Sequence, residues 1–327
     1  DCFGVAKFFK SYSAPTDLEQ VKTALSGLLE GKSFDSFRIT ANRTDKRFPF
    51  KSDQINRDMG QYVKDLTGAR VDLTHPDLHI HLDVLAKEIL IYFDEVRGYG
   101  GLPVGTSGLV TAMLSGGIDS PVAAWQLMKR GCQVQFVHFH SYPLVNMSSI
   151  EKVVDLTQHL TKFQYGSKLH LVPLGEIQKK IILSTPPAYR VIFYRRFMMR
   201  VTEELARRHK SMAILTGESC GQVASQTLEN IAAIDAVVNM PVLRPLIGYN
   251  KEEIVDVARA LGTYTTSIQP DQDCCSLFVP KHPETRSDLE TVVRLESVLD
   301  VDELVKMALE NTEVREFSSP VEAAIPA

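Results

Sequence analysis

The sequence predicts an α/β protein in which a small α+β domain precedes a larger domain built on a parallel sheet. The chain has 327 residues, and at roughly 100–200 residues per domain this length suggests about two domains. Five glycines within the eleven residues 98–108 mark a junction between them. After this junction, apolar segments alternate between strand and helix patterns. That alternation is typical of a parallel sheet with covering helices.

Short helices and strands are predicted before the glycine-rich junction. Residues 18–30 carry apolar side chains at helical spacing, and residues 56–66 suggest a second helix. Residues 78–84 alternate apolar and polar side chains, as a half-buried strand does. Residues 34–41 and 89–96 are the other strand candidates. This mixture predicts an α+β domain that spans residues 1–100.

The remainder of the chain predicts one α/β domain and a tail. Strands are expected at 109–114, 134–139, 169–173 and 213–216, and helices at 121–130, 148–161, 189–209 and 250–261. These elements define a domain over residues 101–285. The last 44 residues carry 11 acidic and 4 basic side chains, so we expect residues 286–327 to form a solvated, acidic helical tail.

Composition excludes several classes of protein. With 44% hydrophobic and 23% charged residues, the chain is neither disordered nor collagen-like. No apolar run approaches the roughly 18–20 residues that span a bilayer, and no signal peptide opens the sequence, so we expect no membrane partner. The net charge of −4 averages over two basic segments, 38–70 and 189–210. Nucleic acid therefore remains a candidate partner.

The five cysteines indicate a reducing compartment, the cytoplasm. Their odd number and wide spacing are not those of a disulfide scaffold, and without a CxxC pair a zinc ribbon is not expected. We interpret Cys2, Cys132 and Cys220 as small buried hydrophobic residues. Cys274 and Cys275 differ from them because they lie in a polar segment.

The segment 109–120, Leu-Val-Thr-Ala-Met-Leu-Ser-Gly-Gly-Ile-Asp-Ser, predicts a phosphate-binding loop. An apolar strand leads into two glycines, and a helix begins at about Ser120 with Pro121 in its first turn. Glycines let main-chain N–H groups approach an anion, and a helix N-terminus adds donors. We expect Ser120 to cap this helix. A bare Ser-Gly-Gly would be no more than a strand-to-helix turn, and the motif is neither Walker A nor the Rossmann fingerprint.

The complete Ser-Gly-Gly-x-Asp-Ser motif resembles the PP-loop of ATP pyrophosphatases, the adenine nucleotide alpha hydrolase-like enzymes. Residues 43–52 and 73–77 resemble a THUMP domain, a tRNA-binding module. With the segments 137–140, 194–196, 216–230 and 273–276, residues 1–285 resemble the ThiI-type tRNA sulfurtransferases, or 4-thiouridine synthetases. Residues 1–13 resemble the end of the ferredoxin-like region that precedes THUMP in this family. With no rhodanese-like domain after residue 285, we expect the rhodanese-less form.

This resemblance implies ATP-dependent thiolation of uridine 8 in tRNA, in which uridine is adenylated and its 4-oxygen is replaced by sulfur from a cysteine persulfide. It implies catalytic roles for Cys274 and for Asp119, the latter through Mg²⁺. It assigns ATP contacts to Met113, Leu114, Ser115, Gly116, Gly117, Ser120, His138, Phe139, Arg195, Gly217 and Gln226. A cysteine desulfurase as sulfur donor, a homodimer and, in some members, a role in thiamine biosynthesis also follow from it.

Several alternatives stand beside these assignments. His138 and Phe139 have the ordinary interpretation of core residues, and Arg195 that of a salt-bridge partner. The candidate phosphate contacts for tRNA are Arg43, Lys46, Arg47 and Lys51. At the level of the whole chain, the alternatives are another PP-loop RNA-modifying enzyme of the 2-thiolation type and a non-catalytic tRNA-binding module.

Overall fold

The computed structural model describes residues 2–270 and 282–319. The chain divides into two compact units. The N-terminal unit is Ala6–Gly98, and the C-terminal unit combines Tyr99–Ala327 with Asp1–Val5. Within the described ranges, the structure contains no helix with the length and apolar character needed to cross a membrane.

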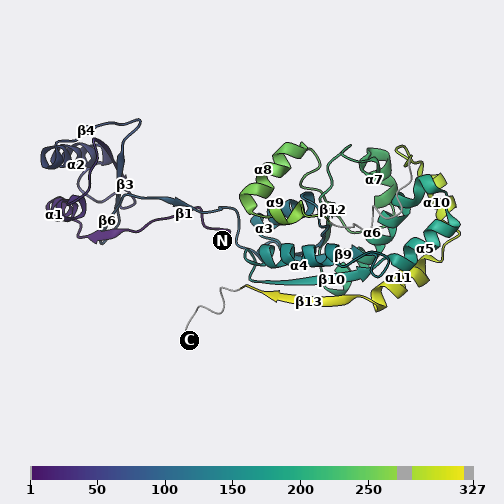
Figure 1. The fold of residues 1–327 in the computed structure, drawn as a ribbon. Helices are drawn as coiled ribbons and strands as arrows, with labels where there is room; N and C mark the ends of the chain where they lie inside the picture. The colour runs from purple at the N-terminus through teal and green to yellow at the C-terminus, as the bar shows by residue number, and fades with distance from the viewer. Residues whose placement is uncertain (1, 271–281, 320–327) are drawn as a thin grey trace. The chain divides into compact units, whose positions relative to one another are not determined.

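The N-terminal unit is a five-stranded sheet with two helices (Figure 1). Its strand order is β2-β6-β5-β3-β4, with β3 parallel to both β4 and β5 and with β6 antiparallel to β5 and β2. The strands are β2 (Tyr12–Ala14), β3 (Ser36–Arg43), β4 (Arg70–Val71), β5 (Leu78–Val84) and β6 (Ile89–Tyr92). The helices are α1 (Leu18–Leu29) and α2 (Ser52–Thr67), and a separate ladder pairs β1 (Lys7–Phe8) with β7 (Val96–Arg97).

Alternation along β3 and β5 builds the core of this unit. Phe37 and Ile39 of β3 and Ile80 and Leu82 of β5 are all buried, together with the apolar faces of α1 and α2. The predicted α+β organisation is confirmed. Helix α2 begins four residues before the predicted start at residue 56, because its first three residues, 52–54, are polar and carry no apolar periodicity.

The C-terminal unit is built on a six-stranded sheet with the order β12-β11-β8-β9-β10-β13. All neighbouring strands are parallel except β13, which runs antiparallel to β10. The strands are β8 (Leu109–Met113), β9 (Gln133–His140), β10 (Gly166–Pro173), β11 (Ala213–Leu215), β12 (Val242–Leu243) and β13 (Glu313–Ser318). The predicted parallel sheet is confirmed, with one antiparallel edge strand added.

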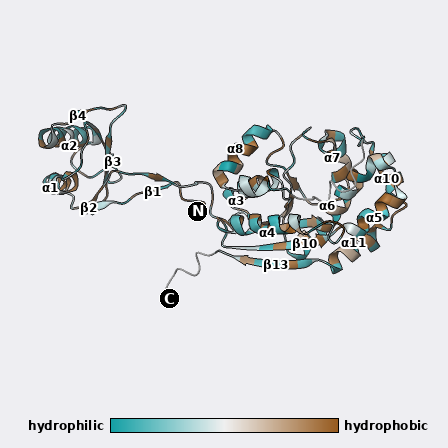
Figure 2. Cartoon of the chain, viewed as in Figure 1, coloured by the Kyte–Doolittle hydropathy of each residue, from teal (hydrophilic) through white to brown (hydrophobic). Residues whose placement is uncertain are grey.

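Helices cover both faces of this sheet and create two hydrophobic cores (Figures 1 and 2). One core contains α3 (Asp119–Lys129), α4 (Ser148–Thr161) and α8 (Lys251–Leu261), and the short α9 (Tyr264–Ser267) packs beside them. The other contains α5 (Gly175–Ser184), α6 (Arg190–Arg208), α7 (Leu228–Asp235), α10 (Leu289–Glu296) and α11 (Val301–Glu310). Two 3₁₀ turns, η1 (Pro187–Tyr189) and η2 (Ala224–Gln226), complete the described elements. Burial on both faces explains why the strands read as continuous apolar runs.

The acidic C-terminal segment is not the solvated helical tail that its composition suggested. Val292 of α10 and Leu304 of α11 are buried in the second core, and β13 adds the sixth strand of the sheet. Net acidity obscured this packing, because every charged residue of the two helices except Glu296 is exposed, while a few apolar residues and Glu296 face inward. Helices α5 and α7 were also missed, since both are short.

Of the three cysteines interpreted as small buried hydrophobic residues, one is buried and two are exposed. Cys132 is buried, as expected of a small hydrophobic residue, but Cys2 and Cys220 are exposed, so that interpretation was wrong for both. Cys220 lies in the loop after β11, between buried Ser219 and exposed Gly221. Cys274 and Cys275 lie outside the described residues.

Candidate active site

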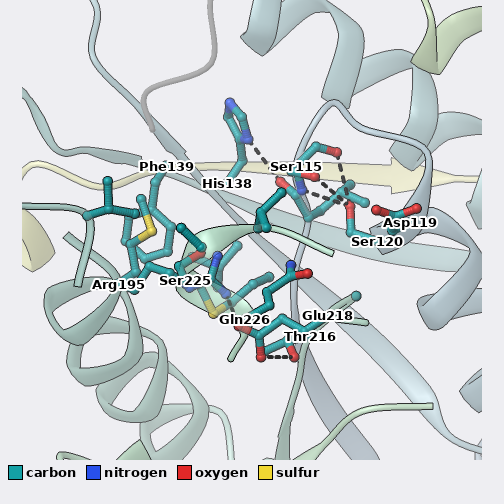
Figure 3. A pocket seen from close by; sticks show the side chains of 18 of the residues that line it. Ser115, Asp119, Ser120, His138, Phe139, Arg195, Thr216, Glu218, Ser225 and Gln226 are labelled. Atoms are coloured by element: carbon teal, nitrogen blue, oxygen red, sulfur yellow. Dashed lines mark hydrogen bonds and ion pairs between the residues drawn. The ribbon is translucent and has the colours of Figure 1, made fainter. Parts of the chain in front are cut away.

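A cavity of about 530 Å³ opens at the carboxyl ends of the parallel strands. The chain runs from β8 to β9 on one side and later reaches β11 on the other, so β8 and β11 flank a switch point in strand order. Open α/β sheets bind ligands in the crevice at such points. The predicted site residues that line the cavity are Met113, Leu114, Ser115, Asp119, Ser120, His138, Phe139, Arg195, Gly217 and Gln226. Figure 3 shows side chains from the PP-loop segment, β9, α6 and residues 216–226 converging on it.

Hydrogen bonds within residues 115–120 hold the PP-loop in shape. The Ser120 hydroxyl accepts a bond from the Ser115 N–H (2.9 Å) and lies 3.0 Å from the Ser115 hydroxyl. The Gly117 N–H donates to the Ser115 hydroxyl at 3.3 Å. The expectation that Ser120 caps the helix was wrong, because α3 already begins at Asp119 and the serine hydroxyl closes the loop instead. Gly116 and Gly117 belong to the loop but do not line the cavity.

Gly217 brings the end of β11 against the start of α3. A Cβ atom at this position would lie 2.7 Å from both the Cα and the N atom of Ser120, far inside van der Waals contact. Only glycine allows this approach without moving the backbone of the PP-loop. The segment after β11 therefore helps to fix the loop from the far side of the cavity.

Two residues far away in sequence engage the Asp119 carboxylate. Lys251, the first residue of α8, pairs with it at 2.5 Å, and the Gln222 side-chain amide donates to it at 2.9 Å. Sequence reasoning missed both residues. A capping box formed by Asn250 and Glu253 fixes the start of α8, and so it fixes where Lys251 begins. No periodicity in the sequence indicates which loop this lysine reaches.

A buried ion-pair network orients Arg195 at the cavity wall. Its guanidinium donates to Glu218, whose other carboxylate oxygen accepts bonds from Arg244 (2.6 Å) and Thr216 (2.9 Å). Arg244 in turn forms a bidentate pair with Asp235. Burial alone would raise the pKa of Glu218, but the charges of Arg195 and Arg244 outweigh it and lower that pKa. Glu218 therefore stays ionised and holds Arg195 in place.

His138 and Gln226 contribute in different ways. His138 is buried, with Nδ1 2.9 Å from the Leu114 carbonyl oxygen and Nε2 3.4 Å from the Ser149 hydroxyl. Its ring thus braces the end of β8 while it lines the cavity. Gln226 differs, because its buried Oε1 atom accepts no hydrogen bond within the described part of the protein. A buried acceptor left open in a cavity suits a ligand N–H group.

The carboxylates near the cavity do not form a metal cage. Across residues 2–270 and 282–319, no group of three or more His, Cys, Asp or Glu side chains is arranged to hold a metal ion. Mg²⁺ commonly binds one or two carboxylates and completes its shell with phosphate oxygens and water. Asp119 supplies one such carboxylate beside the predicted phosphate-binding loop, so the residues present fit Mg²⁺ binding of this type.

The candidate RNA contacts lie together in the N-terminal unit, at the end of β3 and the start of α2. Lys46, Arg47 and Lys51 are exposed. Arg47 also pairs with Asp45 at 2.8 Å. Arg43 instead donates to the carbonyl oxygens of Phe48 (3.0 Å) and Phe50 (2.8 Å), so it shapes the loop that presents the others.

Comparison with known proteins identifies the family. The family model "Thiamine biosynthesis protein (ThiI)" matches residues 105–301, and a THUMP domain model matches residues 15–94. A protein of Thermus thermophilus named "Probable tRNA sulfurtransferase" is 50% identical over 320 residues, which cover 98% of this chain and 79% of that protein. The chain belongs to the ThiI family. The resemblance inferred from the PP-loop, the THUMP-like segments and their order is thereby confirmed.

Further ThiI relatives agree with this assignment. A Moorella thermoacetica protein with the same name is 44% identical, over 95% of this chain and 80% of its own length. A solved structure described as a 4-thiouridine synthetase–RNA complex with bound ATP is 38% identical. It superposes with a TM-score of 0.86 over 95% of this chain and 83% of that one. The order of a THUMP domain before a ThiI domain is therefore shared along most of the chain.

Proposed function

We propose that this ThiI-family protein is an ATP-dependent tRNA sulfurtransferase that converts uridine 8 of tRNA to 4-thiouridine. The observation that carries the proposal is the cavity at the switch point. The cavity combines a PP-loop held by its own hydrogen bonds, an arginine fixed by the ionised Glu218, and a buried Gln226 oxygen that accepts no hydrogen bond within the described part of the protein. The chain that contains it is 50% identical to a protein named as a probable tRNA sulfurtransferase. In this proposal, residues before about 100 bind RNA and residues after about 100 carry out adenylation and sulfur transfer.

The cavity residues would bind ATP and favour attack on its α-phosphate. Main-chain N–H groups of the PP-loop and the N-terminus of α3 suit the β- and γ-phosphates. Met113, Leu114, His138 and Phe139 form an apolar wall for the adenosine, and Arg195 faces developing negative charge. Asp119 would hold Mg²⁺, a cation that neutralises phosphate charge when bound. The uridine 4-oxygen then attacks the α-phosphorus, pyrophosphate leaves, and the oxygen becomes part of a good leaving group.

Sulfur transfer follows on the adenylated base. In our proposal the terminal sulfur of a persulfide on Cys274 attacks C4, and AMP leaves with the former uridine oxygen. The thiolate form is the nucleophile in such chemistry. The product is then linked to Cys274 through an S–S bond. Attack of a second thiol on the Cys274 sulfur releases 4-thiouridine and leaves a disulfide. Cys275, Cys220 and an external thiol are the candidates for that role.

We further propose that a cysteine desulfurase supplies the persulfide and that the enzyme acts as a homodimer in the cytoplasm. Both partners are expectations from the family resemblance. Co-purification with a tagged desulfurase in the presence of L-cysteine tests the first. Light scattering coupled to size-exclusion chromatography tests the second, with a monomer mass as the result that contradicts it.

One reaction tests the function directly. The protein is incubated with ATP, Mg²⁺, a desulfurase, L-cysteine and unmodified tRNA, and nucleosides are identified by mass spectrometry with their positions. We expect 4-thiouridine at position 8 and stoichiometric pyrophosphate. A 2-thiolated base would favour the other PP-loop class. Tight tRNA binding without pyrophosphate release would favour a non-catalytic module.

A further inference from the structure

A second cavity lies in the C-terminal unit, and it is separate from the cavity of the candidate active site. Its volume is about 540 Å³, within the range of small-ligand pockets, and none of the described residues that line one cavity lines the other. Its walls are the last turns of α3, one face of α8 and the segment that precedes α8. The adenylation chemistry proposed above uses none of its residues.

The glycine-rich segment 98–108 fixes one wall of this second cavity. The Leu102 N–H donates to the Lys129 carbonyl oxygen at 3.0 Å. Gly101, the residue before Leu102, has a φ of +78°, and a Cβ atom there would lie 2.1 Å from the same carbonyl oxygen. Only glycine allows so close an approach in this conformation. The segment that the sequence marks as a junction therefore also holds the end of α3, from which the Lys129 and Arg130 side chains project.

Lys129 and Arg130 give the second cavity a positive charge. Neither residue forms an ion pair within residues 2–270 and 282–319, and none of the described lining residues is acidic. Arg130 is exposed and Lys129 is partly exposed. A concave site lined by charges of one sign attracts ions of the opposite sign. The Lys129 ammonium group also lies 5.3 Å from the centre of the Trp125 ring, so a cation and an aromatic surface are adjacent.

Aromatic and apolar side chains form most of the other walls. The buried indole N–H of Trp125 donates to no acceptor within the described part of the protein, which suits an acceptor on a ligand. Tyr249 is 38% exposed and lines the cavity from the segment before α8, and Val257 and Leu261 of α8 add apolar surface. Aromatic side chains stack on bases of any type, and neighbouring cations bind the phosphates. Only unpaired bases are free to enter such a site.

We propose that the second cavity binds an unpaired nucleotide of tRNA, an inference that rests on the proposed function. The base stacks in the aromatic part of the cavity, near Trp125 and Tyr249, and its phosphates pair with Lys129 and Arg130. The target uridine reacts in the C-terminal unit, so this unit must hold the RNA in addition to the contacts expected in the N-terminal unit. Two contacts on one RNA strengthen the complex, because the second contact forms within it.

The fluorescence of Trp125 tests this inference directly, because it is the only tryptophan among the 327 residues. Unmodified tRNA is titrated into the protein without ATP, so that no turnover occurs. We expect saturable quenching of the emission, with the dissociation constant that anisotropy of labelled tRNA gives. A blunt RNA duplex of similar length has the phosphates but no unpaired base, and it should leave the emission unchanged.

The double variant Lys129→Ala with Arg130→Ala tests the two cations. It should weaken tRNA binding at least about fivefold and reduce the slope of log K against log salt by about one to two. The matched control is Lys180→Ala with Lys210→Ala, which removes two exposed lysines of the same unit that line neither cavity. This control should bind tRNA as the parent does. If the double variant fails to fold, Arg130→Gln alone should reduce the slope by about one.

Several results overturn the inference. Binding of tRNA without a change in Trp125 emission places the RNA elsewhere, and equal quenching by the blunt duplex excludes base stacking. Parent affinity in the double variant excludes the two cations, and quenching by AMP but not by tRNA assigns the cavity to a free nucleotide. If anisotropy detects no binding of tRNA to the parent protein, the proposed function itself fails, and this result is distinct from binding without quenching.

Discussion

Two carboxyl groups, one in each unit, share a pKa of about 2 and have different surroundings. In the N-terminal unit, hydrogen bonds from Arg47 lower the pKa of Asp45, and the Arg47 side chain is 84% exposed. In the C-terminal unit, burial alone would raise the pKa of Glu296, but bonds from Arg200 and Arg196 reverse that effect. Glu296 is 6% exposed and Arg196 is 3% exposed.

The comparison shows that the two units use charge for different purposes. Pairs with an exposed arginine, such as Asp45–Arg47, are screened by salt and contribute little to stability, so the cation remains available to a polyanion. Buried pairs cannot lose one partner without leaving an uncompensated charge, so they hold helices and catalytic side chains in place. Substitutions in the C-terminal unit should therefore affect chemistry and folding, and those in the N-terminal unit should affect salt-dependent binding.

The largest expected effect is at Asp119, where the charge faces both the PP-loop and Lys251. Asp119→Asn should lower the rate of pyrophosphate release by about 10³-fold, the order of loss seen when one electrostatic contact to a transition state is removed. Thermal unfolding should change little, since the carboxylate lies at the rim. The control is Asp256→Asn, a change at a 76% exposed carboxylate of α8. Equal rates for the two variants would exclude a role for Asp119 in adenylation.

The next largest expected effect is on the stability of the protein at acid pH, through the ionised Glu296. Because folding lowers its pKa from 4.5 to about 2, this carboxyl stabilises the protein above pH 4.5 and loses that contribution as the pH falls toward 2. The shift corresponds to about 3 kcal/mol. Glu296→Gln should lower the free energy of unfolding at pH 7 by about this amount and flatten its dependence on pH. Urea titrations across the acid range measure both.

A matched substitution sharpens this test. Glu204 pairs with Arg208 on the exposed face of α6, with side chains 43% and 54% exposed. Glu204→Gln should cost less than about 1 kcal/mol at any pH. A cost equal to that of Glu296→Gln would mean that burial does not distinguish the two pairs.

A smaller effect is expected on tRNA affinity in the N-terminal unit. Changing Lys46, Arg47 and Lys51 together to alanine should reduce the slope of log K against log salt by about one for each phosphate that is no longer neutralised. The reason is that each cation releases counterions from the RNA when it binds. Affinity measured over a salt series gives the slope, and an unchanged slope would place the RNA elsewhere.

The control for that measurement comes from the end of α6. Arg207 and Arg208 are exposed but pair with Glu203 and Glu204. We interpret them as a solvated helix face, so Arg207→Ala with Arg208→Ala should leave the salt slope unchanged. A reduction there as large as that of the triple variant would contradict the division of labour between the units.

The smallest effect is expected at Cys220. This thiol is exposed at the loop after β11, and it does not line the cavity. Cys220→Ser should change the free energy of unfolding by less than about 0.5 kcal/mol and leave 4-thiouridine formation unchanged. Loss of product in this variant would assign the second thiol of the reaction to Cys220.

The sequence by itself determined the parts of this protein that are local. The strand, the two glycines, the aspartate and the start of the helix follow one another in the sequence, so the PP-loop could be predicted at residues 109–120. Apolar periodicity located most long helices and central strands for the same reason. The family followed from the order of such segments, and the cavity brings most of the predicted ATP contacts together.

Only the tertiary structure decided which distant residues meet. Lys251 reaches Asp119, and Arg244 reaches Glu218, because separate strands and helices end at the same edge of one sheet. The place of β13 in that sheet and the burial of Glu296 were hidden by an acidic composition. Periodicity in the sequence indicates which face of a helix or strand is buried, but not which other element packs against that face. The position of a charged side chain in the site depends on that packing.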